Sequence, residues 1–128
     1  MQSNDATVLV VEDDAELNRL MGAYVSLCGC KYRPALTGSE AMSSATQRAP
    51  SLILLDLMLP DVDGFEVCRF LRSTEATRDV PIVIVSALSG TDDIEHGRAC
   101  GADEYLTKPV APDRLISTIK HYAHNGKS

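Results

Sequence analysis

The 128-residue sequence has no tryptophan and only two phenylalanines, so aromatic side chains can contribute little to its core. Hydrophobic residues still make up 45% of the chain, and most of them are aliphatic. This length and composition predict one domain over residues 1–128, with a folded core at about 7–124 and short flexible ends. The chain has no room for a second core of comparable size.

Positive charge is also scarce, with 12 lysines and arginines against 18 acidic residues and a net charge of -6. This balance argues against direct nucleic-acid binding, which requires a basic face. No apolar run approaches the roughly 20 residues needed to cross a bilayer. Residues 1–5 lack the basic and apolar segments of a signal peptide. We therefore expect a soluble, cytoplasmic protein without a membrane partner.

The four cysteines lack the spacing of a zinc or thioredoxin motif, because no pair follows the C-x-x-C pattern. Cys28 and Cys30 are separated only by Gly29, which is too close for an ordinary local disulfide. Cys68 and Cys100 lie among apolar or small residues. We expect all four to be reduced and mostly buried.

Four short apolar runs are present, and each ends in polar residues. The runs 8–11, 52–55, 82–85 and 105–106 lead into Glu12-Asp13-Asp14, Asp56, Ser86 and Lys108-Pro109, respectively. If these runs are parallel strands, their polar ends meet at one edge of the sheet, where open α/β sheets place their active sites. Such a group of carboxylates, hydroxyl and lysine predicts a metal-assisted phosphoryl-acceptor site.

Strand and helix patterns alternate along the chain. Strands are expected at 8–11, 32–36, 51–56, 81–86 and 103–107, with helices after the first four, and a last helix that begins at Pro112. Asp13 or Asp14, Ser39 and Thr91 are the expected caps of the first, second and fourth helices. Pro34 places the second strand at an edge, since proline cannot donate a ladder hydrogen bond. The pattern predicts a doubly wound α/β sheet with helices on both faces.

A flavin-binding version of this fold would need a phosphate-cradling loop rich in serine, threonine or glycine after the first strand. Glu12, Asp13 and Asp14 occupy that loop and would repel a phosphate unless a cation intervened. Asp61-Val62-Asp63-Gly64 is superficially similar to a calcium loop, but it lacks the third ligand and the later glutamate. Neither a flavin site nor a calcium site is therefore predicted.

The chain resembles the receiver domains of two-component response regulators from Val8 to about Tyr122. The resemblance rests on four motifs in order: VLVVEDD at 8–14, LILLDLMLPDVDG at 52–64, PIVIVSA at 81–87 and GADEYLTKP at 101–109. It implies a (βα)5 three-layer sandwich, a flavodoxin-like fold whose parallel five-stranded sheet has the order 2-1-3-4-5.

The resemblance, together with the carboxylate chemistry, makes Asp56 the nucleophile that accepts a phosphoryl group. It implies Mg²⁺ as the cofactor, with Mn²⁺ as a substitute. The implied ligands are Glu12, directly or through water, Asp13, Asp56 and the backbone carbonyl of Met58. Without a cation, carboxylates this close destabilise one another, so Mg²⁺ should stabilise the fold.

Lys108 is then the fixed cation for a phosphoryl oxygen, and a cis peptide between Lys108 and Pro109 would aim it into the site. Ser86 would bond another oxygen, and Tyr105 would fill the space that Ser86 leaves when it moves. The expected result is a shift of the surface formed by the fourth helix, fifth strand and fifth helix, toward a downstream protein. A homodimer that forms on phosphorylation is a further expected partner.

The expected phosphodonor is a sensor histidine kinase or a histidine phosphotransfer protein, chosen by exposed first-helix residues such as Asn18 and Arg19. The protein is thus expected to be a switch that catalyses only its own phosphorylation and dephosphorylation. One alternative is a haloacid-dehalogenase-like aspartyl phosphatase, although Met58 stands where that family needs an acid. Another is a binding module that works without phosphorylation. The sequence leaves open whether this receiver acts alone or belongs to a longer regulator.

Overall fold

Five parallel strands alternate with five helices in the computed structural model, which describes residues 6–125. In chain order the elements are β1 (Thr7–Val11), α1 (Ala15–Leu27), β2 (Lys31–Ala35), α2 (Gly38–Gln47), β3 (Leu52–Leu55), α3 (Gly64–Ser73), β4 (Ile82–Ser86), α4 (Thr91–Ala99), β5 (Glu104–Thr107) and α5 (Pro112–Asn125). The sheet order is β2-β1-β3-β4-β5, which confirms the predicted fold. The predicted flexible ends fall mainly on residues 1–5 and 126–128, outside the described part.

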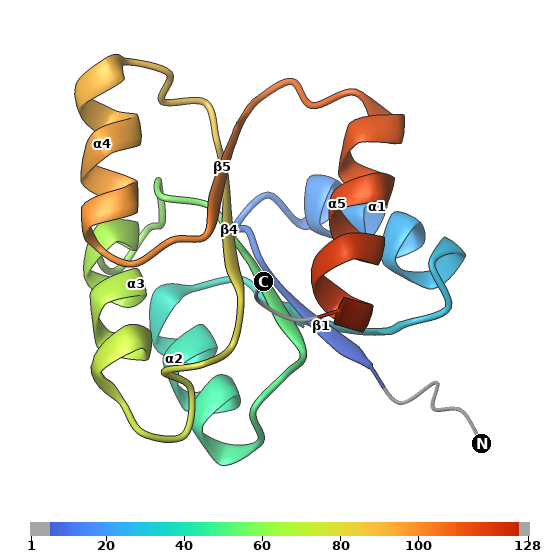
Figure 1. Cartoon of the computed structure of the whole chain (residues 1–128), viewed down its shortest axis with the longest axis horizontal. Helices are drawn as coiled ribbons and strands as arrows, with labels where there is room; N and C mark the ends of the chain where they lie inside the picture. Colours follow the sequence, from blue (N-terminus) through green and yellow to red (C-terminus); the bar gives the residue numbers. More distant parts are fainter. Residues whose placement is uncertain (1–5, 126–128) are drawn as a thin grey trace.

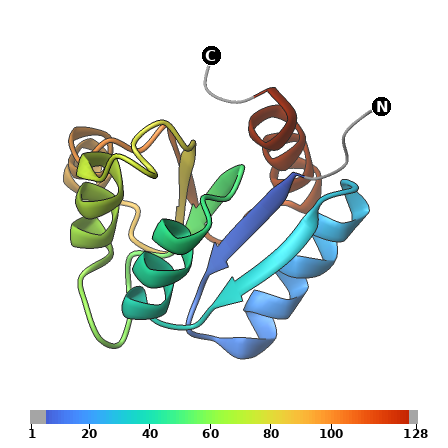
Figure 2. The same cartoon turned by 90° about the horizontal axis from the view of Figure 1, so that it is seen from below.

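The sheet is the middle of three layers. Helices α1 and α5 cover one face, and α2, α3 and α4 cover the other (Figures 1 and 2). Alternate residues of β3 face opposite layers: Ile53 and Leu55 join the cluster under α2, α3 and α4, while Leu52 and Leu54 join the cluster under α1 and α5. The uninterrupted apolar run of β3 is therefore explained by burial on both faces. Among the described residues, no helix is long and apolar enough to span a membrane.

Strand β2 lies at the edge of the sheet, as Pro34 predicted. The N–H of Lys31 donates to the Ala6 carbonyl, and the N–H of Glu12 donates to the Ala35 carbonyl. Backbone groups alternate in direction along a strand, so the nitrogen of Pro34 lies on the open side. The edge therefore has one fewer N–H for pairing with another chain.

Helix caps were predicted in part. Asp14 caps α1, because its Oδ1 accepts from the N–H groups of Glu16 and Leu17 at 3.1 and 3.2 Å. Ser39 as the cap of α2 is wrong: Thr37 occupies that position, and its Oγ1 accepts from the Glu40 N–H at 3.1 Å. Thr91 as the cap of α4 is also wrong. The helix begins at Thr91, after Gly90, whose N–H donates to Asp93.

The buried face of α1 includes a polar residue and leaves one leucine half-exposed. Leu20 is 49% exposed, whereas Asn18, which was expected to be exposed, is only 1% exposed. The Asn18 Nδ2 donates to the carbonyls of Val10, Glu12 and Ala35, at 3.1, 2.9 and 3.2 Å. Its Oδ1 accepts from the Tyr32 hydroxyl at 2.5 Å. Asn18 thus joins α1 to the ends of β1 and β2.

The loop after β3 is held by backbone contact and by two capping carboxylates. A Cβ on Gly64 would overlap the backbone of Leu57 and lie 2.8 Å from the Asp56 carbonyl oxygen, so this close approach requires glycine. Asp63 Oδ1 accepts from the Phe65 N–H at the start of α3. Asp61 accepts from the N–H groups of Gly38 and Ser39, at 2.8 and 2.9 Å, and so caps α2.

The four cysteines are free and buried, as predicted. They divide between the two faces of the sheet. Cys28 and Cys30 pack in the cluster under α1 and α5, and Cys68 and Cys100 pack in the opposite one. Burial raises the pKa of the Cys68 thiol to about 11, which keeps it protonated at neutral pH.

Candidate functional site

The predicted polar residues meet at the carboxyl ends of the central strands. Val11 pairs with Leu55 across β1 and β3, so Glu12 and Asp56 emerge side by side. Leu55 pairs in turn with Ile84 of β4, the strand that Ser86 ends. The parallel register therefore assembles a polar site from segments that are far apart in the sequence.

Three carboxylates form the acidic part of the site. Glu12, Asp13 and Asp56 each present an oxygen, and these oxygens lie within 4.8 Å of one another. Glu12 and Asp56 are buried, whereas Asp13 is exposed. An all-oxygen set of this kind suits Mg²⁺. The N–H of Met58 donates to Asp56 Oδ1 at 3.4 Å, while coordination by the Met58 carbonyl remains a prediction.

Lys108 supplies a positive charge to this cluster. Its Nζ lies 2.6 Å from Glu12 Oε1 and 3.5 Å from Asp56 Oδ2. Burial raises the pKa of Glu12, and the hydrogen bond from Lys108 offsets part of that effect. Burial alone would lower the pKa of Lys108, but its hydrogen bond to Glu12 and the charge of Asp56 outweigh it and raise that pKa. Lys108 therefore stays charged beside the carboxylates.

The peptide bond between Lys108 and Pro109 is cis. The N–H of Lys108 donates to the Ser86 carbonyl at 2.8 Å, just beyond the pairing of Ser86 with Thr107. This bond holds the backbone of Lys108 against the end of β4.

Ser86 and Tyr105 are connected through a residue that the sequence did not single out. The Leu88 N–H donates to the fully buried Ser86 Oγ at 3.2 Å. The Leu88 carbonyl accepts from the Tyr105 hydroxyl at 2.6 Å. Burial raises the pKa of Tyr105, so its hydroxyl remains a donor at neutral pH. Because the groups involved on Leu88 belong to the backbone, the identity of its side chain gave no indication of this role.

Two further supports of the site could not be found from sequence pattern. Asn18 holds the Glu12 carbonyl at 2.9 Å, and the Asp14 N–H donates to Glu12 Oε2 at 3.1 Å. Together they fix the backbone and the side chain of Glu12 at the end of β1. An asparagine next to an arginine on a helix is typical of a solvent-exposed position. For this reason Asn18 was wrongly predicted to be exposed.

Comparison with known proteins agrees with this geometry. The family model described as "Response regulator receiver domain" matches residues 8–120. Transcriptional regulatory protein GltR of Pseudomonas aeruginosa is 38% identical over 120 residues, which are 94% of this chain and 50% of that protein. Protein PilG of the same organism is 30% identical over 119 residues, or 93% of this chain and 88% of that protein. The chain thus spans about half the length of several relatives that it matches.

Solved structures show the same similarity. A putative response regulator from Chloroflexus aurantiacus superposes with a TM-score of 0.88 at 27% identity, covering 94% of this chain and 99% of that one. The BeF3-activated DrrB receiver domain gives a TM-score of 0.86 at 26% identity, with the same coverage. These matches do not favour the phosphatase or the phosphorylation-independent binding module. The chain belongs to the response regulator receiver domain family of two-component systems.

Proposed function

We propose that Asp56 is the residue of this receiver that accepts the phosphoryl group. The observation that carries the proposal is the convergence of Glu12, Asp13 and Asp56 with Lys108 at one sheet edge. A carboxylate oxygen of Asp56 attacks phosphorus, and the bond from phosphorus to the donor breaks, leaving an acyl phosphate. Asp56 suits this role because it follows β3, the middle strand of the sheet, and lies between Glu12 after β1 and Ser86 at the end of β4.

Receiver domains bind Mg²⁺ at an acidic pocket, and we propose Glu12, Asp13, Asp56 and the Met58 carbonyl as its ligands here. The donor set fits, since three carboxylates face a single lysine and leave the cluster with excess negative charge. When bound, the cation would neutralise charge that develops on the phosphoryl oxygens. Mn²⁺, which also prefers oxygen ligands, should substitute.

Lys108 and Ser86 complete the proposed site. Lys108 holds one phosphoryl oxygen by charge, and the Ser86 hydroxyl donates a hydrogen bond to another. These groups would accelerate transfer to and from Asp56 itself and have no separate substrate to turn over. In this sense the protein is a switch and acts only on its own side chain.

Labelling with acetyl phosphate tests the assignment of Asp56. With Mg²⁺, the wild-type protein should gain the mass of one phosphoryl group, measured on the intact chain. Asp56→Asn should gain none, because the amide cannot act as the nucleophile. Asp79→Asn is the matched control, since this exposed side chain makes no hydrogen bond within the described residues. Equal labelling of wild type and Asp56→Asn would contradict the proposal.

We also propose that the phosphodonor, a histidine kinase or a histidine phosphotransfer protein, docks beside α1. An apolar hollow of about 510 Å³ lies between α1 and the segment after β5, and its lining includes Leu17, Leu20, Tyr24 and Val110. Lys108 lines the same hollow, which therefore adjoins the phosphoacceptor site. Half-exposed Leu20 offers the donor apolar contact at this position.

The proposed output face consists of α4, β5 and α5, where a downstream protein or a second phosphorylated copy would bind. Tyr105 lies in β5 and, through Leu88, connects this face to Ser86. Residues 1–128 form a single receiver domain in this proposal, and its net charge of -6 argues against direct nucleic-acid binding by this domain. Four free cysteines fit a reducing compartment such as the cytoplasm.

A further inference from the structure

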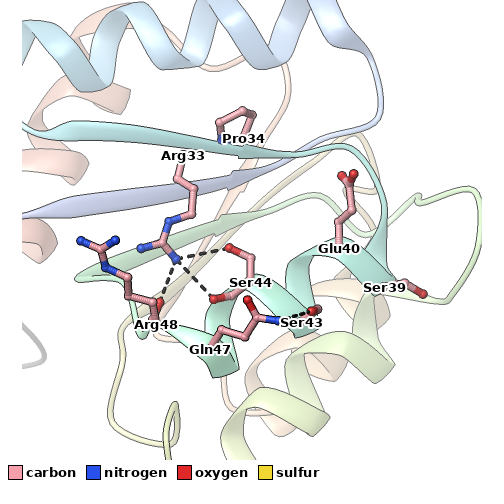
Figure 3. Close-up of a pocket in the computed structure, with 8 residues that line it drawn as sticks. All are labelled: Arg33, Pro34, Ser39, Glu40, Ser43, Ser44, Gln47 and Arg48. Carbon is pink, nitrogen blue, oxygen red and sulfur yellow. Dashed lines mark hydrogen bonds between the residues drawn. The ribbon is translucent and has the colours of Figure 1, made fainter.

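A second hollow, which is lined mainly by polar side chains, lies away from Asp56, between the edge strand β2 and helix α2. It is a shallow depression of about 630 Å³ that is open to the surface. Figure 3 shows that Arg33 reaches it from β2, whereas Ser43, Ser44, Gln47 and Arg48 belong to the last part of α2 and its end. Most of the lining side chains are polar or charged.

Arg33 is fixed at one end of this hollow. Its Nη1 donates to the Arg48 carbonyl at 2.8 Å, and more weakly to the carbonyl and Oγ of Ser44, at 3.4 and 3.3 Å. Figure 3 draws all three bonds on one nitrogen, which leaves Nε and Nη2 as additional donors. The guanidinium is therefore positioned before any ligand arrives, and this lowers the entropic cost of binding.

Two positive charges meet here without an acidic partner. Among the described residues, neither Arg33 nor Arg48 forms a salt bridge, although acidic residues outnumber basic ones in the whole chain. Burial, and then the nearby charge of Arg48, lower the pKa of Arg33. Glu40 lines the far end, where its Oε1 accepts from the Leu36 N–H at 2.7 Å. Figure 3 shows its carboxylate directed away from Arg33.

We propose that this hollow binds a phosphate-bearing small anion, held between the guanidinium groups of Arg33 and Arg48. Arginine presents paired N–H donors that match phosphate oxygens, and a doubly charged anion would relieve the repulsion between the two cations. The hydroxyls of Ser43 and Ser44 line the same space and can donate to the remaining oxygens. The remaining volume can accommodate an organic group attached to the phosphate.

Titration monitored by backbone and arginine Nε chemical shifts tests the proposal. Inorganic phosphate and adenosine 5′-monophosphate are added separately to the 128-residue protein without Mg²⁺, which keeps phosphate from being drawn to the acidic cluster. Saturable shifts should appear at Arg33 and across residues 39–48. Tighter binding of the nucleotide than of phosphate would identify the ligand of this hollow as a phosphorylated metabolite. Equal binding of the two would identify the ligand as free phosphate.

Arg48→Gln should weaken binding about tenfold, which corresponds to the loss of one charge-assisted hydrogen bond. This variant should keep the fold, since the Arg48 side chain donates no hydrogen bond within the described residues. Arg98→Gln, on exposed α4 near the opposite edge of the sheet, removes the same charge and should bind like wild type. Equal weakening in both variants, or shifts confined to the neighbourhood of Asp56 and Lys108, would overturn the proposal.

Discussion

At the scale of single residues, Asn18 is a polar side chain that is almost completely buried and fully hydrogen-bonded. One buried amide serves three backbone carbonyls and receives the Tyr32 hydroxyl. Buried carbonyls at the ends of strands need donors, and the surrounding side chains provide few alternatives. The position of Asn18 depends on where the ends of β1 and β2 meet in space. A helical pattern read along α1 alone could not reveal it.

Asn18→Ala should lower the free energy of unfolding by roughly 3 kcal/mol, because it removes a buried amide that donates to backbone carbonyls and accepts from the Tyr32 hydroxyl. Urea denaturation measures this loss. Arg19→Ala, at the adjacent exposed position, should change stability by about 0.5 kcal/mol or less. Similar losses in the two variants would show that the bonds of Asn18 add little stability.

At the scale of helices and strands, the sequence predicted what depends on local pattern. Continuous apolar runs identified β3 and β4, and Asp14 was correctly included among the candidate caps of α1. The start of α2 was misplaced because Thr37 and Ser39 are both good capping residues, and propensity alone does not choose between them. The sequence did not indicate that Asp61 caps the start of α2. Its hydrogen-bond partners Gly38 and Ser39 lie 23 and 22 residues earlier, too far for a local capping pattern to show.

Asp61 should make stability depend on pH at the acidic end. Hydrogen bonds from the N–H groups of Ser39 and Gly38 lower its pKa from 3.8 to about 2. A lowered folded-state pKa means that the stabilisation is present above pH 3.8 and is lost as the pH falls toward about 2. Asp61→Asn should therefore lose less stability than wild type over this interval, as measured by urea midpoints. Asp79→Asn should keep the wild-type profile, and a profile shared by all three proteins would exclude this role for Asp61.

Helix α4 is placed to respond to the proposed switch. A Cβ on Gly97 would lie 2.9 Å from Ile84 Cδ1 and 3.0 Å from Tyr105 Cδ2, so α4 packs directly on both side chains. Gly97 disfavours the helix locally, but its small size allows this close contact. A displacement of the Tyr105 ring would therefore change its packing against Gly97 and move α4.

A beryllofluoride mimic of the phosphoryl group should shift the backbone resonances of α4, β5 and α5 as well as the loops near Asp56. Ser86→Ala should reduce the distant response because it removes the hydroxyl that Leu88 connects to Tyr105. Modification of Asp56 should persist, since its carboxylate and the metal ligands are unchanged. If the resonance shifts in the wild-type protein are confined to the loops near Asp56, phosphorylation does not change the face formed by α4, β5 and α5, and the protein signals through another surface.

At the scale of the whole molecule, the sheet order was predicted by the resemblance of four sequence motifs to those of receiver domains, and the structure confirms it. The motifs by themselves mark only where four strands end along the chain. The same motifs predicted the grouping of Glu12, Asp13, Asp56 and Lys108. They could not predict the hollow beside β2, which depends on how α2 lies against Arg33.

Mg²⁺ at ten times its dissociation constant should stabilise the fold by about 1.4 kcal/mol and raise the thermal midpoint. The proposed ligands Glu12, Asp13 and Asp56 come together only in the folded chain. Asp13→Ala should lose most of this response, and exposed Asp13 can be replaced without creating a cavity. Thermal unfolding with and without Mg²⁺ measures the effect, and a full response in the variant would remove Asp13 from the ligand set.

The division of the four buried thiols between the two faces of the sheet provides a built-in reporter of local opening. Cys28 and Cys30 can be alkylated only when the layer under α1 and α5 opens, and Cys68 and Cys100 only when the opposite layer does. Their alkylation rates, separated by peptide mass, therefore give an opening free energy for each face without engineered cysteines. The effects of a ligand beside Asp56 and of a ligand beside Arg33 can thus be compared. For each ligand, the cysteines whose alkylation slows identify the layer that the ligand stabilises.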